Sequence, residues 1–553
     1  MTPSDRVPIR DIKQRKERSM PSISLLFPNP EDPRRRETRS MPGYFIDLNL
    51  DQILSAITGW LPDYGLETIF YQNLRSLDEI RYRQHIFQDL EQPELLQGFK
   101  TFSSTLRSVR RTLGSLEKLY NPWHRRGWFL ESARVYQGAV ESLFSMLQQI
   151  PLRSRGFLAL REYLTQYRAS AQFQNLTNEI ETLNKDLSSI RYSIVIKGLT
   201  VRVKKYEGEP DYSSDIESFF SRFRQGDAKN YIVKMNEPVG LSSVETQILS
   251  GVATLFPEIF SHLNTFCENF NVYIDETLDS VERELQFYIT YLDYIRPVQN
   301  AGLPFCYPDF DTSKNLDILD LYDLVLAKKL QGPSALVVTN DLEISGKERI
   351  VVITGPNQGG KTTFARAVGQ LHHLGALGFP VPGRRARLLL ADTIYTHFER
   401  EETTKSQRGR LHEELIALHT NLEHATETSL FILNEIFSST TLKDALYLSS
   451  RILEQILKLD ALAICVTFLD ELSVLNDQVV SMVTSIDPVD PSIRTFKVIR
   501  RPADGLAYAR SIAEKYHLTY EWIHKRFQNK QTDITASPQH QSLVTAATEE
   551  VRR

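Results

Sequence analysis

The strongest constraint on this chain is an apolar strand that runs directly into a glycine-rich loop and then into a helix. Residues 349–354 read Arg-Ile-Val-Val-Ile-Thr, a run typical of a buried strand. Residues 355–362, Gly-Pro-Asn-Gln-Gly-Gly-Lys-Thr, match the pattern GxxxxGK[ST], and we expect a helix from near Thr363. This order predicts a P-loop, whose backbone amides and helix N-terminus bind the phosphates of a nucleotide.

Each residue type in this loop has an expected role. Lys361 would neutralise charge on the β- and γ-phosphates, and the Thr362 hydroxyl would bind Mg²⁺. We therefore expect ATP and Mg²⁺ as cofactors. The expected nucleotide-binding residues of the loop are Gly355, Pro356, Asn357, Gln358, Gly359, Gly360, Lys361, Thr362 and Thr363.

A second apolar strand, Leu430–Leu433, ends in Asn434 and Glu435. P-loop ATPases place a metal-assisting acid and a catalytic carboxylate at this point. Glu435 is expected to orient or deprotonate the attacking water, so Glu435 and Lys361 are the expected catalytic residues. Asn434 would assist the metal without a charge; one charge at about 5 Å and an effective dielectric near 20 contributes at most about 3 kcal/mol. We expect weaker metal binding and slower turnover, with nucleotide binding retained.

Four hydroxyl residues, Ser438–Thr441, follow this second strand. Thr441 and Asp444 have capping-box spacing, which predicts the start of a helix. The hydroxyls either serve as an ordinary helix cap or form a second phosphate contact with the helix amides. A third apolar strand, 462–467, ends at Phe468.

Apolar periodicity divides the chain into two halves. From Tyr44 to about Ile190 it is helical, as in Val135, Ala139, Leu143, Met146, Leu147 and Ile150. Two β-branched runs near 193–205 predict a small hairpin, whose basic residues are either a solvated face or a contact to a phosphate backbone. Beyond residue 335, apolar runs alternate with helices, which indicates a largely parallel α/β sheet.

Residues 258–295 carry one long apolar stripe. The stripe fits either a single projecting helix or two helices with a break near Asn269–Asn271. Pro297 is expected to end the helical pattern.

Charge and composition limit the remaining possibilities. The chain has 65 basic and 69 acidic residues and a net charge of −4, so any nucleic-acid contact must be local. Its three cysteines lack CxxC spacing, which fits a cytoplasmic protein without a disulfide framework. No membrane segment or signal peptide is expected. Residues 1–43 are expected to be a disordered basic tail, either a linker or an arm that touches nucleic acid, and residues 526–553 a second disordered tail.

The chain resembles the MutS family of DNA mismatch-repair proteins. The family's P-loop reads TGPNxGGK[ST], and residues 354–363 match it, including the unusual Pro356 and Asn357. Val381-Pro382, 392–396, 414–435 and Thr440-Thr441 keep register with the family, and 64–67 and 74–81 resemble the start of its lever domain.

The resemblance implies an ABC-type P-loop ATPase domain at 320–525 after a mostly helical lever/core domain at 44–300. It also implies a homodimer joined through the ATPase domains, with levers that embrace DNA. On this analogy Glu414 lies in a loop facing the nucleotide, and Thr440 and Thr441 form a signature loop, with Thr441 acting on the partner's γ-phosphate.

Departures from the family pattern shape the expected function. The N-terminal mismatch-recognition domain is expected to be absent, so the chain would recognise a DNA structure instead of a mismatch. Asn434 replaces an aspartate, Phe468 stands where a histidine is usual, and Val337 takes the place of an adenine-stacking aromatic.

Three functions remain as alternatives. The first is a dimeric, ATP-gated DNA clamp that hydrolyses ATP slowly. The second is a nucleotide-gated dimeric scaffold for a protein partner that reads the ATP state, with vestigial hydrolysis. The third is a transporter-type ATPase, which the missing LSGGQ-like signature disfavours.

Overall fold

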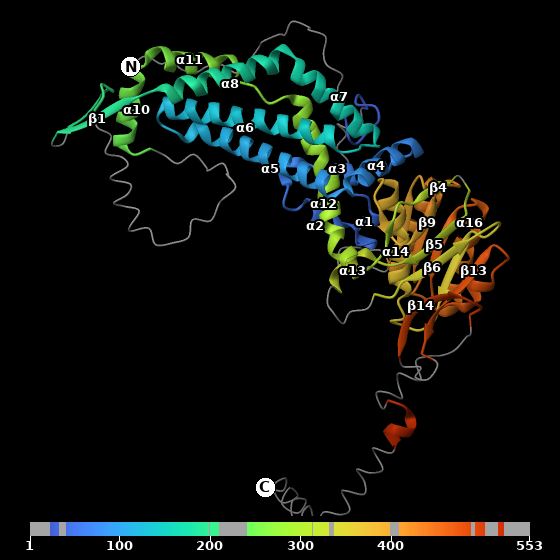
Figure 1. Cartoon of the computed structure of the whole chain (residues 1–553). Helices are drawn as coiled ribbons and strands as arrows, with labels where there is room; N and C mark the ends of the chain where they lie inside the picture. The colour runs from blue at the N-terminus through green and yellow to red at the C-terminus, as the bar shows by residue number, and fades with distance from the viewer. Residues whose placement is uncertain are drawn as a thin grey trace, which may run out of the picture. The chain divides into compact units, whose positions relative to one another are not determined.

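The computed structural model describes residues 23–32, 40–197, 200–209, 241–311, 313–330, 337–398, 409–487, 493–503 and 518–524 (Figure 1). The chain forms two compact units, each interrupted in sequence. The first contains Met1–Glu37 and Tyr82–Tyr291, and the second contains Thr38–Arg81 and Leu292–Arg553. Within the described residues, no helix is both long enough and apolar enough to cross a membrane.

The first unit is built from long antiparallel helices with a two-stranded hairpin, and α5 and α6 run side by side (Figure 1). The predicted helical periodicity is confirmed, but the buried stripe of α6 is centred one residue away from the expected one, on Tyr136, Val140, Leu143 and Leu147. The helices are α4 Leu77–Leu90, which begins in the second unit, α5 Pro93–Ser115, η3 Leu116–Lys118, α6 Pro122–Gln149, α7 Arg155–Ala169, α8 Ala171–Ser189, α10 Ser243–Leu255, α11 Pro257–Asn269 and α12 Glu276–Asn300.

The predicted hairpin is confirmed. Strands β1 (Tyr192–Lys197) and β2 (Thr200–Lys205) pair in antiparallel register. Of its basic residues, Lys204 forms ion pairs with Glu207 and Glu209. This pairing favours the solvated-face interpretation for Lys204, because its charge is already balanced on the same hairpin.

Two helices, not one, account for the long stripe at 258–295. Helix α11 ends at Asn269 and α12 begins at Glu276, so the break falls close to the expected position. Asp275 caps the new helix by accepting from the Leu278 amide at 2.9 Å. The expectation that Pro297 ends the helix is wrong, since α12 continues through it to Asn300.

The expected disordered tail at 1–43 is wrong for residues 23–32. Ile23, Leu25, Leu26 and Phe27 are all buried within the first unit. Their apolar side chains supply the burial that a disordered segment lacks. Residues 1–22, 33–39 and 525–553 lie outside the described part of the chain, so the remaining predictions of disorder there stay untested.

The second unit is a mixed α/β domain around a six-stranded sheet with the order β10-β11-β12-β7-β13-β14. Five strands are parallel and β14 is antiparallel, as the alternating pattern predicts. Smaller sheets pair β3 with β8 and order β4-β9-β5-β6. The strands are β3 Phe305–Cys306, β4 Asp309–Asp311, β5 Leu316–Leu321, β6 Asn340–Ile344, β7 Ile350–Thr354, β8 Val381–Pro382, β9 Arg385–Leu389, β10 Ile394–His397, β11 Leu430–Asn434, β12 Leu462–Val466, β13 Val479–Ile486 and β14 Arg494–Arg500.

Helices cover both faces of the large sheet. Phe431 and Leu433 of β11 share a core cluster with Leu453 of α16. Ile432, which points the other way, lies against Gly369 of α14, where an added Cβ would come within 2.6 Å of its Cδ1. The helices of this unit are α1 Tyr44–Asp47, α2 Leu50–Thr58, η2 Pro62–Tyr64, α3 Glu67–Phe70, α13 Leu324–Lys329, α14 Lys361–Ala376, α15 Arg410–His424, α16 Leu442–Lys458 and η4 Asp470–Val474.

Residues 44–81, expected in the helical domain, instead belong to the second unit. The last residue of α1, Asp47, and the residue after it, Leu48, supply backbone carbonyls to polar side chains of α14. Arg366 Nε donates to Asp47 O, and Gln370 Nε2 donates to Leu48 O, both at 2.9 Å. Because buried polar groups need partners, these bonds attach the segment to α14.

Candidate functional site

The glycine-rich loop joins β7 to α14 with the backbone that its sequence predicts. Gly355 has φ 113° and Gly360 has φ 92°, values that favour glycine. A Cβ at Gly355 would lie 2.5 Å from Thr484 Oγ1, and one at Gly359 would lie 2.7 Å from the same atom. Glycine is therefore required both for the turn and for the close approach of β13.

Lys361 lies across this loop. Its Nζ donates to Gly355 O at 2.9 Å and to Pro356 O at 3.2 Å. The same ammonium lies 4.4 Å from the centre of the Phe468 ring, a cation–π distance. Burial lowers the pKa of Lys361, with an opposing contribution from the Glu435 carboxylate.

Thr362 and Asn434 meet directly. The Thr362 hydroxyl in the first turn of α14 donates to Asn434 Oδ1 at the end of β11, at 2.7 Å. The predicted metal-binding pair is thus brought together from segments 72 residues apart. It offers two uncharged oxygens, a ligand type that suits Mg²⁺ when phosphates supply the charge.

Glu435 follows in an unusual backbone conformation. Its φ is 55°, and its amide donates to Val466 O of β12 at 2.8 Å. A non-glycine residue at positive φ is uncommon and is often found at functional sites. Glu435 lines the same cavity as the glycine-rich loop, as its expected catalytic role requires.

The expectation that Glu414 lies in a loop is wrong. It belongs to α15 and is buried, and its Oε2 accepts from the Phe437 amide at 3.0 Å. Phe437 itself has φ 59°. The carboxylate therefore holds the turn after β11, and Glu414 is absent from the described lining of the cavity.

Thr441 acts as a helix cap. Its Oγ1 accepts from the Asp444 amide at 3.3 Å and donates to the Asp444 carboxylate at 2.8 Å. This geometry matches the cap interpretation of residues 438–441. Neither Thr440 nor Thr441 is among the described residues around the cavity, so their role toward a partner's nucleotide stays a prediction.

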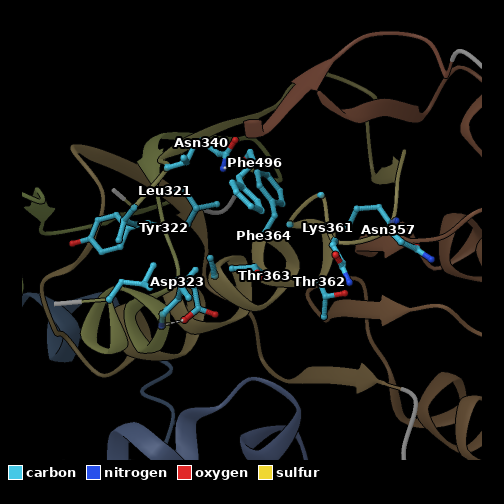
Figure 2. A pocket seen from close by; sticks show the side chains of 18 of the residues that line it. Leu321, Tyr322, Asp323, Asn340, Asn357, Lys361, Thr362, Thr363, Phe364 and Phe496 are labelled. Atoms are coloured by element: carbon cyan, nitrogen blue, oxygen red, sulfur yellow. Dashed lines mark hydrogen bonds between the residues drawn. The ribbon is translucent and has the colours of Figure 1, made fainter. Parts of the chain in front are cut away.

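A cavity of about 410 Å³ opens beside the loop (Figure 2). Its size falls within the range of small-molecule sites. The predicted residues Asn357, Gln358, Gly359, Gly360, Lys361, Thr362, Thr363 and Glu435 line it, whereas Gly355, Pro356 and Asn434 do not. The sequence did not single out most of the remaining lining residues: Leu321, Tyr322, Asp323, Leu326, Leu330, Val338, Asn340, Phe364, Ala367 and Phe496.

Phe496 supplies an aromatic ring at this cavity. It stands with φ 58°, and a Cβ on Gly360 would lie 3.6 Å from its Cδ1. Asn340 holds the strand by donating to Phe496 O at 3.2 Å and accepting from Val498 N at 2.7 Å. Val337, expected in place of an aromatic, lines the cavity too (Figure 2 labels Phe496 and Asn340). No sequence signal identifies Phe496, because the approach of β14 to the loop is long-range.

Asp323 also lines the cavity, but its carboxylate has a structural partner. Its Oδ1 caps α13 by accepting from the Leu326 amide at 2.9 Å. Burial raises its pKa, and the backbone hydrogen bond opposes that rise. Asp323 is therefore a helix cap at the edge of the site.

Part of the chain that contains the site is similar to known proteins of one family. Residues 351–532 match the family model of MutS domain V. The DNA mismatch repair protein MutS of Finegoldia magna is 27% identical over 281 residues, which cover 50% of this chain and 32% of that protein. The Syntrophomonas wolfei MutS is 32% identical over 152 residues, covering 27% and 18%.

A third relative is named as an endonuclease. The Endonuclease MutS2 of Gemmatimonas aurantiaca is 29% identical over 189 residues, covering 33% of this chain and 23% of that protein. The chain thus matches less than a third of the length of each of these three relatives. Residues 351–532 of this chain are therefore similar to MutS domain V, which is the ATPase domain of that family.

Proposed function

We propose that the second unit is an ABC-type P-loop ATPase that binds ATP with Mg²⁺ and hydrolyses it slowly. The observation that carries this proposal is the hydrogen bond between Thr362 and Asn434, which joins the P-loop helix to the end of β11, two strands away from β7 in the sheet. Lys361 and Glu435 line the cavity beside that bond. Phosphate-binding and water-activating groups therefore meet at one site.

The nucleotide fits this cavity with its phosphates at the loop and its base toward β5 and β14. The amides of Gly359 and Gly360 and the N-terminus of α14 favour anionic oxygens. Lys361 would exchange its bonds to Gly355 O and Pro356 O for phosphate oxygens. Phe496, Leu321 and Val337 offer an apolar and aromatic surface to the base.

Thr362 and Asn434 are the residues that would hold Mg²⁺, through a hydroxyl and an amide oxygen. The ion supplies positive charge toward the β- and γ-phosphates. Glu435 would orient the attacking water and accept its proton. Because Asn434 adds no negative charge, we expect weaker metal binding than a carboxylate would give.

At the level of the whole chain, we propose a dimeric clamp that recognises a DNA structure under the control of ATP. Two relatives are DNA mismatch repair proteins by name, which supports DNA as the partner. Closure in a homodimer would bring Thr440 and Thr441 of one subunit toward the nucleotide of the other.

The test is ATP binding, hydrolysis and oligomeric state for the wild-type protein and Glu435→Gln, with branched, mismatched and plain duplex DNA. Glu435→Gln keeps the loop intact, so it should bind ATP but not hydrolyse it, and should accumulate as a dimer. Branched DNA should stimulate the wild-type protein at several salt concentrations, because shape recognition leaves a ratio between substrates as nonspecific binding weakens. A monomer with ATP in both proteins would contradict the clamp.

A second function, a nucleotide-gated scaffold for a protein partner, is favoured by two observations. Asn434 is uncharged, and Lys204 of the hairpin is already paired with acidic residues. ATP-dependent dimerisation without turnover and without any DNA effect would support the scaffold over the clamp.

A further inference from the structure

A short segment without helix or strand, Ile23–Phe27, is buried within the first unit. Leu25 has 0% and Phe27 has 2% of its surface exposed. Its contacts are with α4 and α12, which are distant in sequence. Its order therefore depends on side chains of these two helices, since it forms no ladder with a neighbouring strand.

Side chains of the helices bind the backbone of Ser24 and Leu25. The Tyr82 hydroxyl donates to Ser24 O at 2.6 Å. The Leu25 amide donates to Glu284 Oε2 at 2.5 Å, and the Tyr288 hydroxyl donates to Leu25 O. Burial raises the pKa of Tyr288 far above its usual range, so the hydroxyl keeps the proton it donates.

Arg83 binds the next residue pair. It is fully buried, and its Nε donates to Leu26 O at 2.9 Å. Its guanidinium lies 5.2 Å from the ring centre of Phe27 and 5.0 Å from that of Phe287. The Arg83 guanidinium of α4 therefore makes cation–π contacts with both Phe27 of the segment and Phe287 of α12.

Ser24 contributes a side-chain contact of its own. Its hydroxyl lies 3.1 and 3.0 Å from the two oxygens of Glu284 and donates to that carboxylate. The same Oγ accepts from the amides of Leu26 and Phe27 at 3.1 and 3.2 Å. Each backbone polar group from Ser24 O to Phe27 N thus has a hydrogen-bond partner, as burial demands.

The two helices also contact each other without the segment. The Phe87 ring of α4 lies 4.7 Å from the Tyr288 ring and 6.5 Å from the Phe287 ring of α12. In addition, Gln286 of α12 donates to Ser103 of α5 at 3.0 Å. Helices α4 and α12 are therefore held in place by contacts that do not involve residues 23–27.

We propose that α4 and α12 form a peptide-binding groove, and that Ser24–Phe27 of the same chain is its exchangeable ligand. The ligand class is an extended peptide with a small hydroxyl residue followed by three apolar residues, the third of them aromatic. The backbone of this peptide is bound by hydrogen bonds from four side chains: Glu284, Tyr82, Tyr288 and Arg83. Its apolar side chains are selected because the site buries them. The proposal rests on the first unit alone and is independent of ATP hydrolysis.

The experiment cuts the folded chain and asks whether the groove accepts the same peptide in trans. A site for a specific protease replaces residues 33–39, and the full chain is cleaved after folding. A fluorescently labelled peptide of residues 20–32 is then added in excess, and anisotropy is followed to equilibrium. We expect saturable binding to the cut chain and none to the uncut chain, where the tethered segment fills the groove.

Matched variants distinguish specific binding of the peptide from nonspecific binding. A Leu25→Asp peptide should not bind, because it would bury a charge without a partner. Glu284→Gln in the cut chain should weaken the peptide by about tenfold or more, since a hydrogen bond to a charged group is worth about 1.5–3 kcal/mol. Glu131→Gln, at a half-exposed position on α6, is the control and should leave affinity unchanged.

Three results would overturn the proposal. Loss of helix content on cleavage, followed by circular dichroism, would make the segment an inseparable part of the core. The cut chain could also stay folded but never exchange its segment for the labelled peptide, as measured by mass spectrometry. That result would likewise show that the segment is not an exchangeable ligand. Equal binding of the Leu25→Asp peptide would remove the proposed specificity.

Discussion

The two sides of the candidate nucleotide site differ in how closely they keep the expected chemistry. On the loop side, Gly355, Gly360 and Lys361 have the backbone and position that phosphate binding requires. On the strand-end side, Asn434 is uncharged and Phe468 places a ring against Lys361. We expect nucleotide binding to depend mainly on the loop, and turnover to depend on charge at the strand ends. The difference predicts that the site keeps nucleotide binding while its hydrolysis is reduced.

Lys361→Ala tests the loop side and should have the largest effect. Removing a charge that pairs with phosphate costs about 2–5 kcal/mol, so ATP should bind at least about thirtyfold more weakly. Titration with a fluorescent ATP analogue measures the loss. The exposed Lys443→Ala on α16 is the control and should bind normally. Unchanged affinity in Lys361→Ala would break the assignment of binding to the loop.

Asn434→Asp tests the strand-end side. A carboxylate keeps the acceptor for the Thr362 hydroxyl and adds one negative charge beside the metal ligands. At about 5 Å and an effective dielectric near 20 the gain is at most about 3 kcal/mol. Hydrolysis measured against Mg²⁺ concentration should therefore saturate at about tenfold less Mg²⁺.

Asn434→Ser serves as the matched control, because it offers an oxygen without the charge. If both substitutions had the same effect, charge would not be what distinguishes the two sides.

Phe496→Leu tests whether contact with the nucleotide base adds to the ATP affinity that the loop provides. The substitution keeps apolar volume but removes the aromatic face, which is worth about 0.5–1.5 kcal/mol. ATP affinity should fall by about two- to tenfold, while inorganic triphosphate should bind as before. Equal weakening of both ligands, measured by calorimetry, would show that Phe496 acts on the loop and not on the base.

Phe468→Leu should have the smallest effect. The ring competes for the Lys361 ammonium, and an exposed cation–π contact is worth about 0.5–1 kcal/mol. Releasing it should tighten ATP binding by about two- to fivefold. Among the described cation–π pairs, Lys361 contacts the ring of Phe468 and not that of Phe496. Phe496→Leu therefore serves as the comparison variant, because it removes an aromatic ring without releasing Lys361. Weaker binding in Phe468→Leu would mean that the ring positions the lysine instead of restraining it.

Much of the candidate site could be predicted because it is local in sequence. The glycine-rich loop was predicted from eight consecutive residues, and the expected strand before it and helix after it are confirmed. The parallel sheet and the hairpin were likewise predicted from apolar periodicity. Both depend on spacing within short windows, which the sequence displays directly.

The failures are long-range. Glu414 binds the Phe437 amide across 23 residues, and Asn340 holds β14 across 156 and 158. Residues 23–27 look like part of a basic tail, yet they are buried against helices up to 263 residues away. Polar side chains of this kind select their partners by proximity in the fold, which periodicity does not encode.

By itself, the sequence determined that the chain carries a glycine-rich loop between a strand and a helix, a following α/β sheet and a mostly helical first half, because backbone propensity and apolar spacing are local properties. Only the tertiary structure decided that residues 44–81 pack on α14, that Phe496 lines the cavity and that Ser24–Phe27 are buried against α4 and α12. These contacts exist because buried backbone groups and aromatic rings require partners, and the partners come from distant parts of the chain.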